Sequence, residues 1–383
     1  MCKKIKIVII HNIAWSHYRA GILFNFYKLL KSHNLELKVI NIALTNKDRI
    51  KLSNNIDLSN HKYPFNILFN DVYEKVPIYK KIYRLIIELI INKPNIVIIC
   101  GYDKPEFIAA LLISKIIKAK TIIDTDTTYF QKSRSWYKEI VKKSIIRLFD
   151  YGFPRSNFAK DYLCKLGLKK EKQIIVPHAT CYFKNLNDKF EIDKIKKKYK
   201  INTNKNFIFV GRLIKLKNLQ LLIEAFSMIK KSSCKSNKWG LILVGEGEEK
   251  EYLENLVKLL FLSDVFFVGA QPWDIIPYFY AISDVFILPS TSESWGLVVN
   301  EAMMHSLPMI VSNRVGASEI VKEGENGFIF DPYRIDTLIN IMLKIINEEV
   351  DIKKMGIVAN RTIKNYTSQY SAEKMFEGIK NII

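Results

Sequence analysis

Two glutamates eight positions apart, Glu293 and Glu301, have the most informative spacing in this chain. They lie in DVFILPSTSESWGLVVNEA, residues 284–302, where an apolar strand ended by Pro289 runs into a short polar loop and then a helix. Such a loop presents backbone N–H groups and the positive end of a helix to an anionic ligand. The segment indicates an anion site beside two carboxylates, although two solvated glutamates on an ordinary strand–helix unit would give the same pattern.

Two cations follow an earlier strand, and both suit a diphosphate. Arg212 and Lys217 can offer a forked donor and a point charge to phosphate oxygens, or they are surface cations. Gly211, ahead of Arg212, would let the backbone approach a ligand closely, and Gly245 and Gly247 would do the same at the next strand end. The chemistry these residues suit is the binding of a phosphorylated ligand with hydroxyl groups for the carboxylates.

The segments that carry these residues occur in a specific order. They are FVGRLIKLKNLQLLIEAF (209–226), LILVGEGEEKEYLENL (241–256), the E-x7-E element around Gly296 (293–301) and PMIVSNRVGASEIVKEGENGFIF (308–330). Over residues 205–335 the chain resembles the retaining, nucleotide-sugar-dependent glycosyltransferases of family 4, of the type used in bacterial surface polysaccharide assembly. The resemblance implies α/β GT-B architecture, two Rossmann-like domains facing each other across a cleft. The N-terminal half resembles the family only in outline.

The resemblance implies roles for residues of the C-terminal half. Arg212 and Lys217 match residues that hold the donor diphosphate. Glu293 matches a residue that contacts hydroxyl groups of the donor sugar, and Glu301 one that binds the ribose. The implied donor-binding set is Gly211, Gly245, Gly247, Gly296, Leu297 and Glu301, with Glu293, Arg212 and Lys217 in the reaction itself. No metal or bound cofactor is implied. Retention on this fold is usually explained by front-face attack, in which the leaving diphosphate accepts the acceptor proton.

Apolar runs alternate with helical periods along the chain, which predicts α/β domains with parallel sheets. Strands are expected near 5–10, 36–42, 96–100, 121–124, 207–210, 240–244, 265–268, 284–288, 309–312 and 327–330. We expect an acceptor-binding domain over 1–185, completed by a C-terminal helix at about 366–383, and a nucleotide-sugar domain over 186–365. The charged stretch 178–204 is the expected linker.

Length and composition agree with two globular domains. The chain has 383 residues, enough for two cores, and its 49% hydrophobic content excludes a disordered chain. The longest apolar runs are interrupted by charge before the ~20 residues that a spanning helix needs, and the opening MCKKIKIVII has no signal-peptide cleavage site. Five scattered cysteines without a C-x-x-C pair favour a reducing cytoplasm and argue against zinc or disulfides.

Positive charge is concentrated in the N-terminal half. Residues 1–200 hold 39 Lys and Arg against 17 Asp and Glu, a formal charge of +22, whereas residues 201–383 carry −1. This asymmetry suggests an anionic partner: a membrane leaflet, a lipid-linked diphosphate or nucleic acid. No recognition-helix, zinc-finger or ribonucleoprotein motif supports nucleic acid. We therefore expect a cytoplasmic protein, peripheral on the inner face of the membrane, although a Lys-rich composition could also contribute.

One basic segment has the pattern of a membrane-surface helix. In WYKEIVKKSIIRLF, residues 136–149, an apolar stripe and four basic residues occupy different faces of a helix. The stripe consists of Trp136, Ile140, Val141, Ile145, Leu148 and Phe149. The helix could lie on a membrane, or its stripe could pack against its own sheet.

Acceptor-side candidates come from loops at the carboxyl ends of the first domain's strands, where α/β sheets bind ligands. Where many relatives of this family carry a histidine, this chain has Asp124 and Asp126, which could orient or deprotonate the acceptor hydroxyl, or could cap a helix. His17 and Arg19 are further candidates, and His178 is given no role. Asp126 is our catalytic candidate. Asp124 and Asp126 have the D-x-D spacing of a metal site, but they lie in the N-terminal domain, whereas the donor phosphates are expected in the C-terminal domain.

The sequence thus predicts a metal-independent, retaining, hexosyltransferase-type enzyme. It would move sugar from a nucleotide-sugar donor to a lipid-linked or surface glycan, for example in lipopolysaccharide or capsule assembly. Two alternatives stay open: a nucleotide-sugar epimerase of the same fold, and a basic protein that binds a membrane or nucleic-acid surface.

Overall fold

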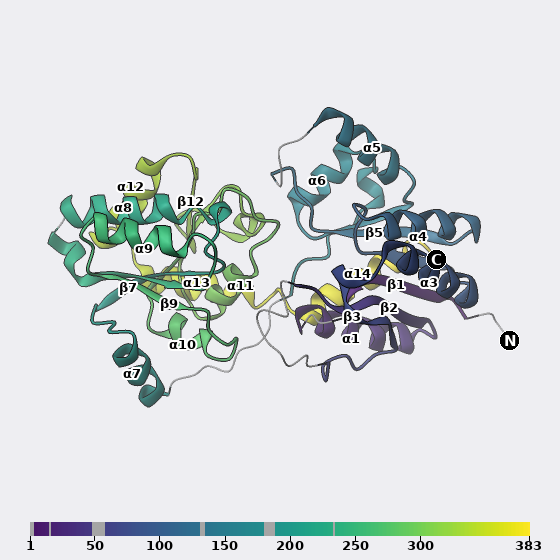
Figure 1. Ribbon diagram of the computed structural model, residues 1–383, viewed down its shortest axis with the longest axis horizontal. Helices are drawn as coiled ribbons and strands as arrows, with labels where there is room; N and C mark the ends of the chain where they lie inside the picture. Colours follow the sequence, from purple (N-terminus) through teal and green to yellow (C-terminus); the bar gives the residue numbers. More distant parts are fainter. Residues whose placement is uncertain (1–3, 15–16, 48–57, 131–134, 180–187, 233) are drawn as a thin grey trace. The chain divides into compact units, whose positions relative to one another are not determined.

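The chain divides into two compact units. A computed structural model describes residues 4–14, 17–47, 58–130, 135–179, 188–232 and 234–383. Unit 1 comprises Met1–Cys181 with Tyr366–Ile383, and unit 2 comprises Tyr182–Asn365. Each unit is built on its own parallel sheet (Figure 1).

The sheet of unit 1 has the strand order β3-β2-β1-β4-β5-β6, and every neighbouring pair is parallel. Its strands are β1 (Lys6–Ile13), β2 (Glu36–Thr45), β3 (Phe65–Val72), β4 (Ile96–Ile99), β5 (Lys120–Thr125) and β6 (Tyr151–Pro154). The sequence analysis missed β3 and β6. β3 is a half-exposed edge strand with polar residues in it, and β6 is short and contains Gly and Pro, so neither shows the apolar run of a central strand.

Alternate residues of these strands enter two separate cores, as the two-residue period of a strand requires. Val8 and Ile10 of β1 face one core, and Ile7 and Ile9 face the other. The helices of unit 1 are α1 (His17–Ser32), α3 (Ile78–Asn92), α4 (Pro105–Ile116), α5 (Trp136–Ile146), α6 (Asn157–Lys165) and α14 (Ser368–Lys380). Apolar residues of α3, α4 and α6 fill the first core, and those of α1 and α14 fill the second.

Unit 2 repeats this plan with the strand order β12-β11-β10-β7-β8-β9. Its strands are β7 (Lys205–Val210), β8 (Trp239–Val244), β9 (Val265–Gly269), β10 (Val285–Leu288), β11 (Met309–Ser312) and β12 (Gly327–Phe330). Its helices are α7 (Lys189–Lys198), α8 (Leu219–Ser232), α9 (Lys250–Leu259), α10 (Ile276–Ala281), α11 (Leu297–Met304), α12 (Ile335–Ile346) and α13 (Ile352–Ile363). Figure 1 shows α8, α9 and α12 on one side of the sheet and α10, α11 and α13 on the other.

The boundary between the two units falls inside the expected linker. Much of the expected linker, 178–204, is the helix α7, which begins after the N-cap Asp188 and packs against α10. The apolar stripe of residues 136–149 does not pack as a whole on the sheet. Ile146 and Phe149 are buried, but Trp136, Ile140 and Val141 are more than half exposed.

Each sheet has a point where the chain reverses its direction of winding. In unit 1 this switch point lies between β1 and β4, and in unit 2 it lies between β7 and β10. In open α/β sheets, ligands bind in the crevice outside the carboxyl ends of the strands at such a point. None of the helices in the described part of the chain has the length and apolar content needed to cross a bilayer.

Candidate functional site

The loops that follow β7 and β8 touch each other through their backbones. A Cβ atom on Gly245 would lie 1.9 Å from the carbonyl oxygen of Gly211, and one on Gly247 would lie 2.1 Å from that of Leu213. The Gly211 N–H donates to Val244 (2.9 Å) and the Leu213 N–H to Glu246 (2.9 Å). These glycines let the two loops approach each other, whereas the sequence analysis expected them to let the backbone approach a ligand. The contact between the loops fixes the start of the segment that carries Arg212 and Lys217.

Lys217 and Glu293 meet at the switch point of unit 2. Lys217 ends a single 3₁₀ turn, Lys215–Lys217, after β7, and its ammonium group forms an ion pair with the carboxylate of Glu293. The Lys217 side chain is 12% exposed and that of Glu293 26% exposed, so the pair is accessible to a ligand. Arg212, on the same loop, is exposed.

Backbone contacts hold the loop of Glu293 in place. Its N–H donates to the carbonyl of Arg314 (3.1 Å), and its own carbonyl accepts from the N–H of Gly316 (3.2 Å). Gly296 then adopts a left-handed conformation, φ 93°, as the N-cap of α11. The loop is therefore positioned by main-chain bonds and a glycine turn, and the Leu297 N–H lies in the first turn of the helix.

Glu301 lies on α11 and is buried, with 7% of its surface exposed. The hydroxyl of Tyr280, itself buried, donates to Glu301 Oε2 at 3.0 Å. The ring of His305 stacks on that of Tyr280, with centroids 5.3 Å apart. Burial lowers the pKa of His305 to about 4, so this imidazole is neutral at pH 7. The sequence analysis did not identify Tyr280, since a tyrosine in an apolar helix normally reads as core.

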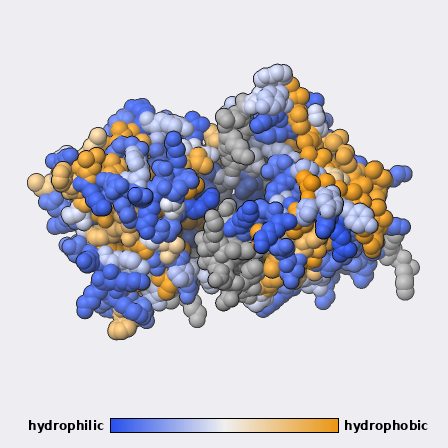
Figure 2. All heavy atoms as spheres, viewed as in Figure 1, coloured by the Kyte–Doolittle hydropathy of each residue, from blue (hydrophilic) through white to orange (hydrophobic). Residues whose placement is uncertain are grey.

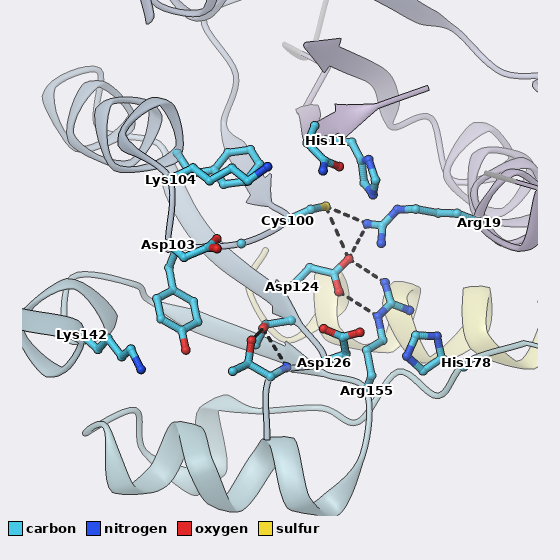
Figure 3. Close-up of a pocket in the computed structure, with 16 residues that line it drawn as sticks. His11, Arg19, Cys100, Asp103, Lys104, Asp124, Asp126, Lys142, Arg155 and His178 are labelled. Atoms are coloured by element: carbon cyan, nitrogen blue, oxygen red, sulfur yellow. Dashed lines mark hydrogen bonds and ion pairs between the residues drawn. The ribbon is translucent and has the colours of Figure 1, made fainter. Parts of the chain in front are cut away.

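Unit 1 has a pocket of about 480 Å³ at its own switch point. It is lined by the carboxyl ends of β1, β4, β5 and β6, as Figure 3 shows. Three of the acceptor-side candidates line it: Arg19, Asp124 and Asp126. The side chain of His17 lies outside the described residues. We refer to this pocket as the unit 1 pocket.

Asp124 is the centre of a buried ion cluster at this pocket. It accepts from Arg155 Nε at 2.8 Å and Arg155 Nη2 at 2.6 Å, and from Arg19 Nη2 at 2.5 Å (Figure 3). Burial favours the neutral acid, but the two guanidinium groups outweigh it and hold the pKa of Asp124 well below its usual range. Asp124 is therefore neither a helix cap nor a group suited to take a proton, which corrects two of its expected roles.

Asp126 lines the same pocket, but its pKa is shifted in the opposite direction from that of Asp124. Among the described residues it forms no ion pair, and burial raises its pKa despite the nearby guanidinium of Arg155. A carboxylate with a raised pKa is better suited to accept a proton than one held by two guanidinium groups. The structure thus separates the two aspartates that the sequence left equivalent.

Several pocket residues were not identified from the sequence. Arg155 directly follows β6, and Cys100 follows β4 and accepts from Arg19 Nη2 at 2.7 Å. Burial is the main reason that the pKa of His178, given no role earlier, falls to about 3. His11, Asp103, Lys104 and Lys142 are among the other residues of the lining. Recognising β6 would have revealed Arg155, because it stands at the carboxyl end of that strand.

Comparison with known proteins finds relatives for the C-terminal half of the chain. Residues 191–365 match the model of the family described as glycosyl transferases group 1. An uncharacterized glycosyltransferase of Haemophilus influenzae is 30% identical over 182 residues, which cover 47% of this chain and 49% of that protein. The capsular polysaccharide biosynthesis glycosyltransferase CapM of Staphylococcus aureus is 27% identical over 206 residues, 51% of each chain. The chain thus matches about half the length of these relatives.

A solved structure extends the comparison to both units. Anabaena HepE in complex with UDP has a TM-score of 0.74 at 18% identity, covering 98% of this chain and all of that one. The α/β fold class of two Rossmann-like GT-B domains is confirmed. The resemblance to family 4 glycosyltransferases is confirmed as well, since residues 191–365 match the model of the glycosyl transferases group 1 family.

Proposed function

We propose that this protein is a retaining glycosyltransferase that moves a sugar from a nucleoside diphosphate donor to a lipid-linked or surface glycan. The Lys217–Glu293 ion pair at the switch point of unit 2 carries the proposal. A donor brings a diphosphate that can replace the carboxylate as partner of Lys217, and sugar hydroxyl groups that can replace the ammonium as partners of Glu293. CapM, a protein of capsular polysaccharide biosynthesis, and HepE, solved with UDP, support the glycan product and the nucleotide donor.

In the proposed reaction each of these residues has a defined role. Arg212, Lys217 and the N–H groups at Gly296 and Leu297 hold the diphosphate, and Glu301 accepts from ribose hydroxyls. The bond between the sugar's anomeric carbon and the diphosphate breaks while the acceptor oxygen attacks from the same face. A departing phosphate oxygen takes the acceptor proton, and the cations stabilise the charge that develops there. Asp126 orients the acceptor hydroxyl, and no metal is required because Arg212 and Lys217 neutralise the diphosphate.

The two glutamates should fail in different ways when each is changed to glutamine. The donor is first selected by thermal shift, since a ligand at 100 times its Kd stabilises the folded protein by about 2.7 kcal/mol. With that donor, Glu293→Gln should slow transfer about tenfold to a hundredfold. Its affinity for the free nucleoside diphosphate should change little. Glu301→Gln should weaken binding of both nucleotide and nucleotide sugar, because the lost carboxylate binds ribose. Calorimetry and initial rates measure the two effects.

Glu325→Gln is the matched control for this pair, because Glu325 is exposed on a turn outside the switch point. Normal turnover in Glu293→Gln would contradict the role given to that residue. Interconversion of the donor sugar without any acceptor present would favour the epimerase instead.

The exposed surface of unit 1 suits a membrane acceptor. Large apolar side chains are exposed on three helices that cover the same face of the sheet: Ile90 and Ile91 on α3, Leu112 and Ile116 on α4, and Trp136, Ile140 and Val141 on α5. Figure 2 shows hydrophobic residues gathered along these helices. Lys138 and Lys143 on α5 are exposed beside them. An anionic leaflet would cover the apolar groups and attract the lysines.

Replacing Lys138 and Lys143 together with glutamine should weaken binding to anionic vesicles about tenfold or more, since each lysine at such a surface contributes ~1 kcal/mol. Sedimentation with vesicles at low salt measures this, and binding should fall as salt rises. Transfer to a short water-soluble acceptor should be unchanged. Lys142 is left intact, because it is bonded to Glu139 and lines the unit 1 pocket.

Lys197→Gln with Lys198→Gln on α7 removes the same charge from an exposed helix of unit 2 and should leave vesicle binding unchanged. Equal binding of the wild type to neutral and anionic vesicles would refute the membrane proposal. Tighter binding to DNA of any sequence would favour a nucleic-acid surface.

A further inference from the structure

We propose that the unit 1 pocket binds a hydroxylated ligand that carries an anionic group, a phosphate or a carboxylate, next to its attacking hydroxyl. The inference rests on the proposed function, since it defines the chemical class of the acceptor. It is carried by the charges that line the pocket, by their burial and by the position of the pocket at a switch point.

The two guanidinium groups in the pocket wall carry more positive charge than the one carboxylate that they share. The other cations of the lining are Lys104 and Lys142, and Lys142 is already paired with Glu139 outside the lining. Asp124 is shared by two guanidinium groups, so its single negative charge leaves one positive charge over. The Arg19 Nε atom is also buried without a hydrogen-bond partner among the described residues. A buried donor of this kind gains free energy when a ligand oxygen reaches it.

The ammonium group of Lys104, on another side of the pocket, also lacks full compensation for its charge. It stands at the N-cap of α4, after β4, and its ammonium lies 3.9 Å from the ring centroid of Tyr73. Burial lowers the pKa of Lys104, and Asp103 and Glu74 offset that effect only in part. An anion near this ammonium would restore the stabilisation lost on leaving water.

Two other basic groups of the lining, Lys142 and His178, do not change this balance. Lys142 is paired with Glu139, which lies outside the pocket lining, and His178 is neutral because burial lowers its pKa to about 3. Asp126 forms no ion pair with these cations among the described residues. It can accept from a hydroxyl group of the ligand while the cations bind the anion. A hydroxyl beside an anionic group matches this arrangement.

Three probes with the same ring test the inference on the full chain. D-Glucose, D-glucuronate and D-glucose 6-phosphate differ only in the substituent on the fifth ring carbon, which is hydroxymethyl, carboxylate or phosphate ester. Calorimetry should show at least one anionic probe binding about tenfold more tightly than glucose. Lys104→Gln should remove most of this preference. Lys120→Gln, at the opposite end of β5, removes the same charge and should retain it.

Binding in unit 2 is distinguished by repeating the titrations with Arg212→Ala, which should keep the preference. Glucose binding as tightly as both anionic probes would overturn the inference, and so would a preference that survives in Lys104→Gln or disappears in Arg212→Ala. Preference for only one anion supports the inference and identifies the substituent. Affinity for a nucleoside diphosphate, measured on the same samples, reports on the proposed function separately.

Discussion

Replacing Asp124 with asparagine is expected to lower the free energy of unfolding by about 3–5 kcal/mol, as removal of one partner from a buried ion pair does. The substitution leaves Arg19 and Arg155 beside each other without their carboxylate, and Arg155 is only 4% exposed. The cluster also links α1, β5 and β6, so its loss affects several elements at once. Urea denaturation followed by circular dichroism measures the change.

Asp126→Asn is the matched control, because it makes the same substitution two positions away. Asp126 forms no ion pair among the described residues and its pKa is raised by burial, so the folded state favours the neutral form. Asp126→Asn should therefore leave stability at pH 7 unchanged or higher. Equal destabilisation by both substitutions would contradict the distinction between the two aspartates.

The pH dependence of stability follows from the direction of each shift. The pKa of Asp124 is lowered in the folded state, so its contribution is present above the ordinary value of 3.8 and is lost as pH falls below it. Buried His178 and His305 have pKa values of about 3 and about 4 against 6.5 unfolded. Below pH 6.5 the unfolded chain binds these protons first, so stability should already decline between pH 6.5 and 4. Histidine side chains of the folded protein that titrate near the ordinary value of 6.5 would contradict the burial of His178 and His305.

Arg212→Ala and Lys217→Ala should each slow transfer and weaken nucleoside diphosphate binding about tenfold to a hundredfold, since a hydrogen bond to a charged group contributes ~1.5–3 kcal/mol. Lys217→Ala also removes the ion-pair partner of Glu293, so it should lower the free energy of unfolding as well. Calorimetry with the nucleoside diphosphate and initial rates measure the losses.

Lys215→Ala is the control for these cations, because Lys215 is exposed on the same 3₁₀ turn. Transfer by the wild type should persist in EDTA. Unchanged nucleotide affinity in both Arg212→Ala and Lys217→Ala would exclude this diphosphate site, and loss of transfer in EDTA would show that a metal is needed.

The sequence predicted the fold class because the central strands are continuous apolar runs. β1, β4 and β10 have strong patterns, since both faces of a parallel sheet are buried. β3 and β6 were missed because edge strands are half exposed or short, and their pairing depends on neighbours far away in the chain. Long-range pairing also decides the site. Asp124 and Asp126 are equivalent in the sequence, and only the approach of Arg19 and Arg155 distinguishes them.

The helix α14 determines when unit 1 can be completed during synthesis. Ala372, Met375, Phe376 and Ile379 of α14 are part of a core that α1 and β1 share, yet they follow all of unit 2 in the chain. A nascent chain therefore exposes this apolar surface of α1 until residues 368–380 leave the ribosome, while unit 2 already has all its own elements. Unit 1 is therefore synthesised in part before unit 2, but its core can be completed only after unit 2 has been synthesised.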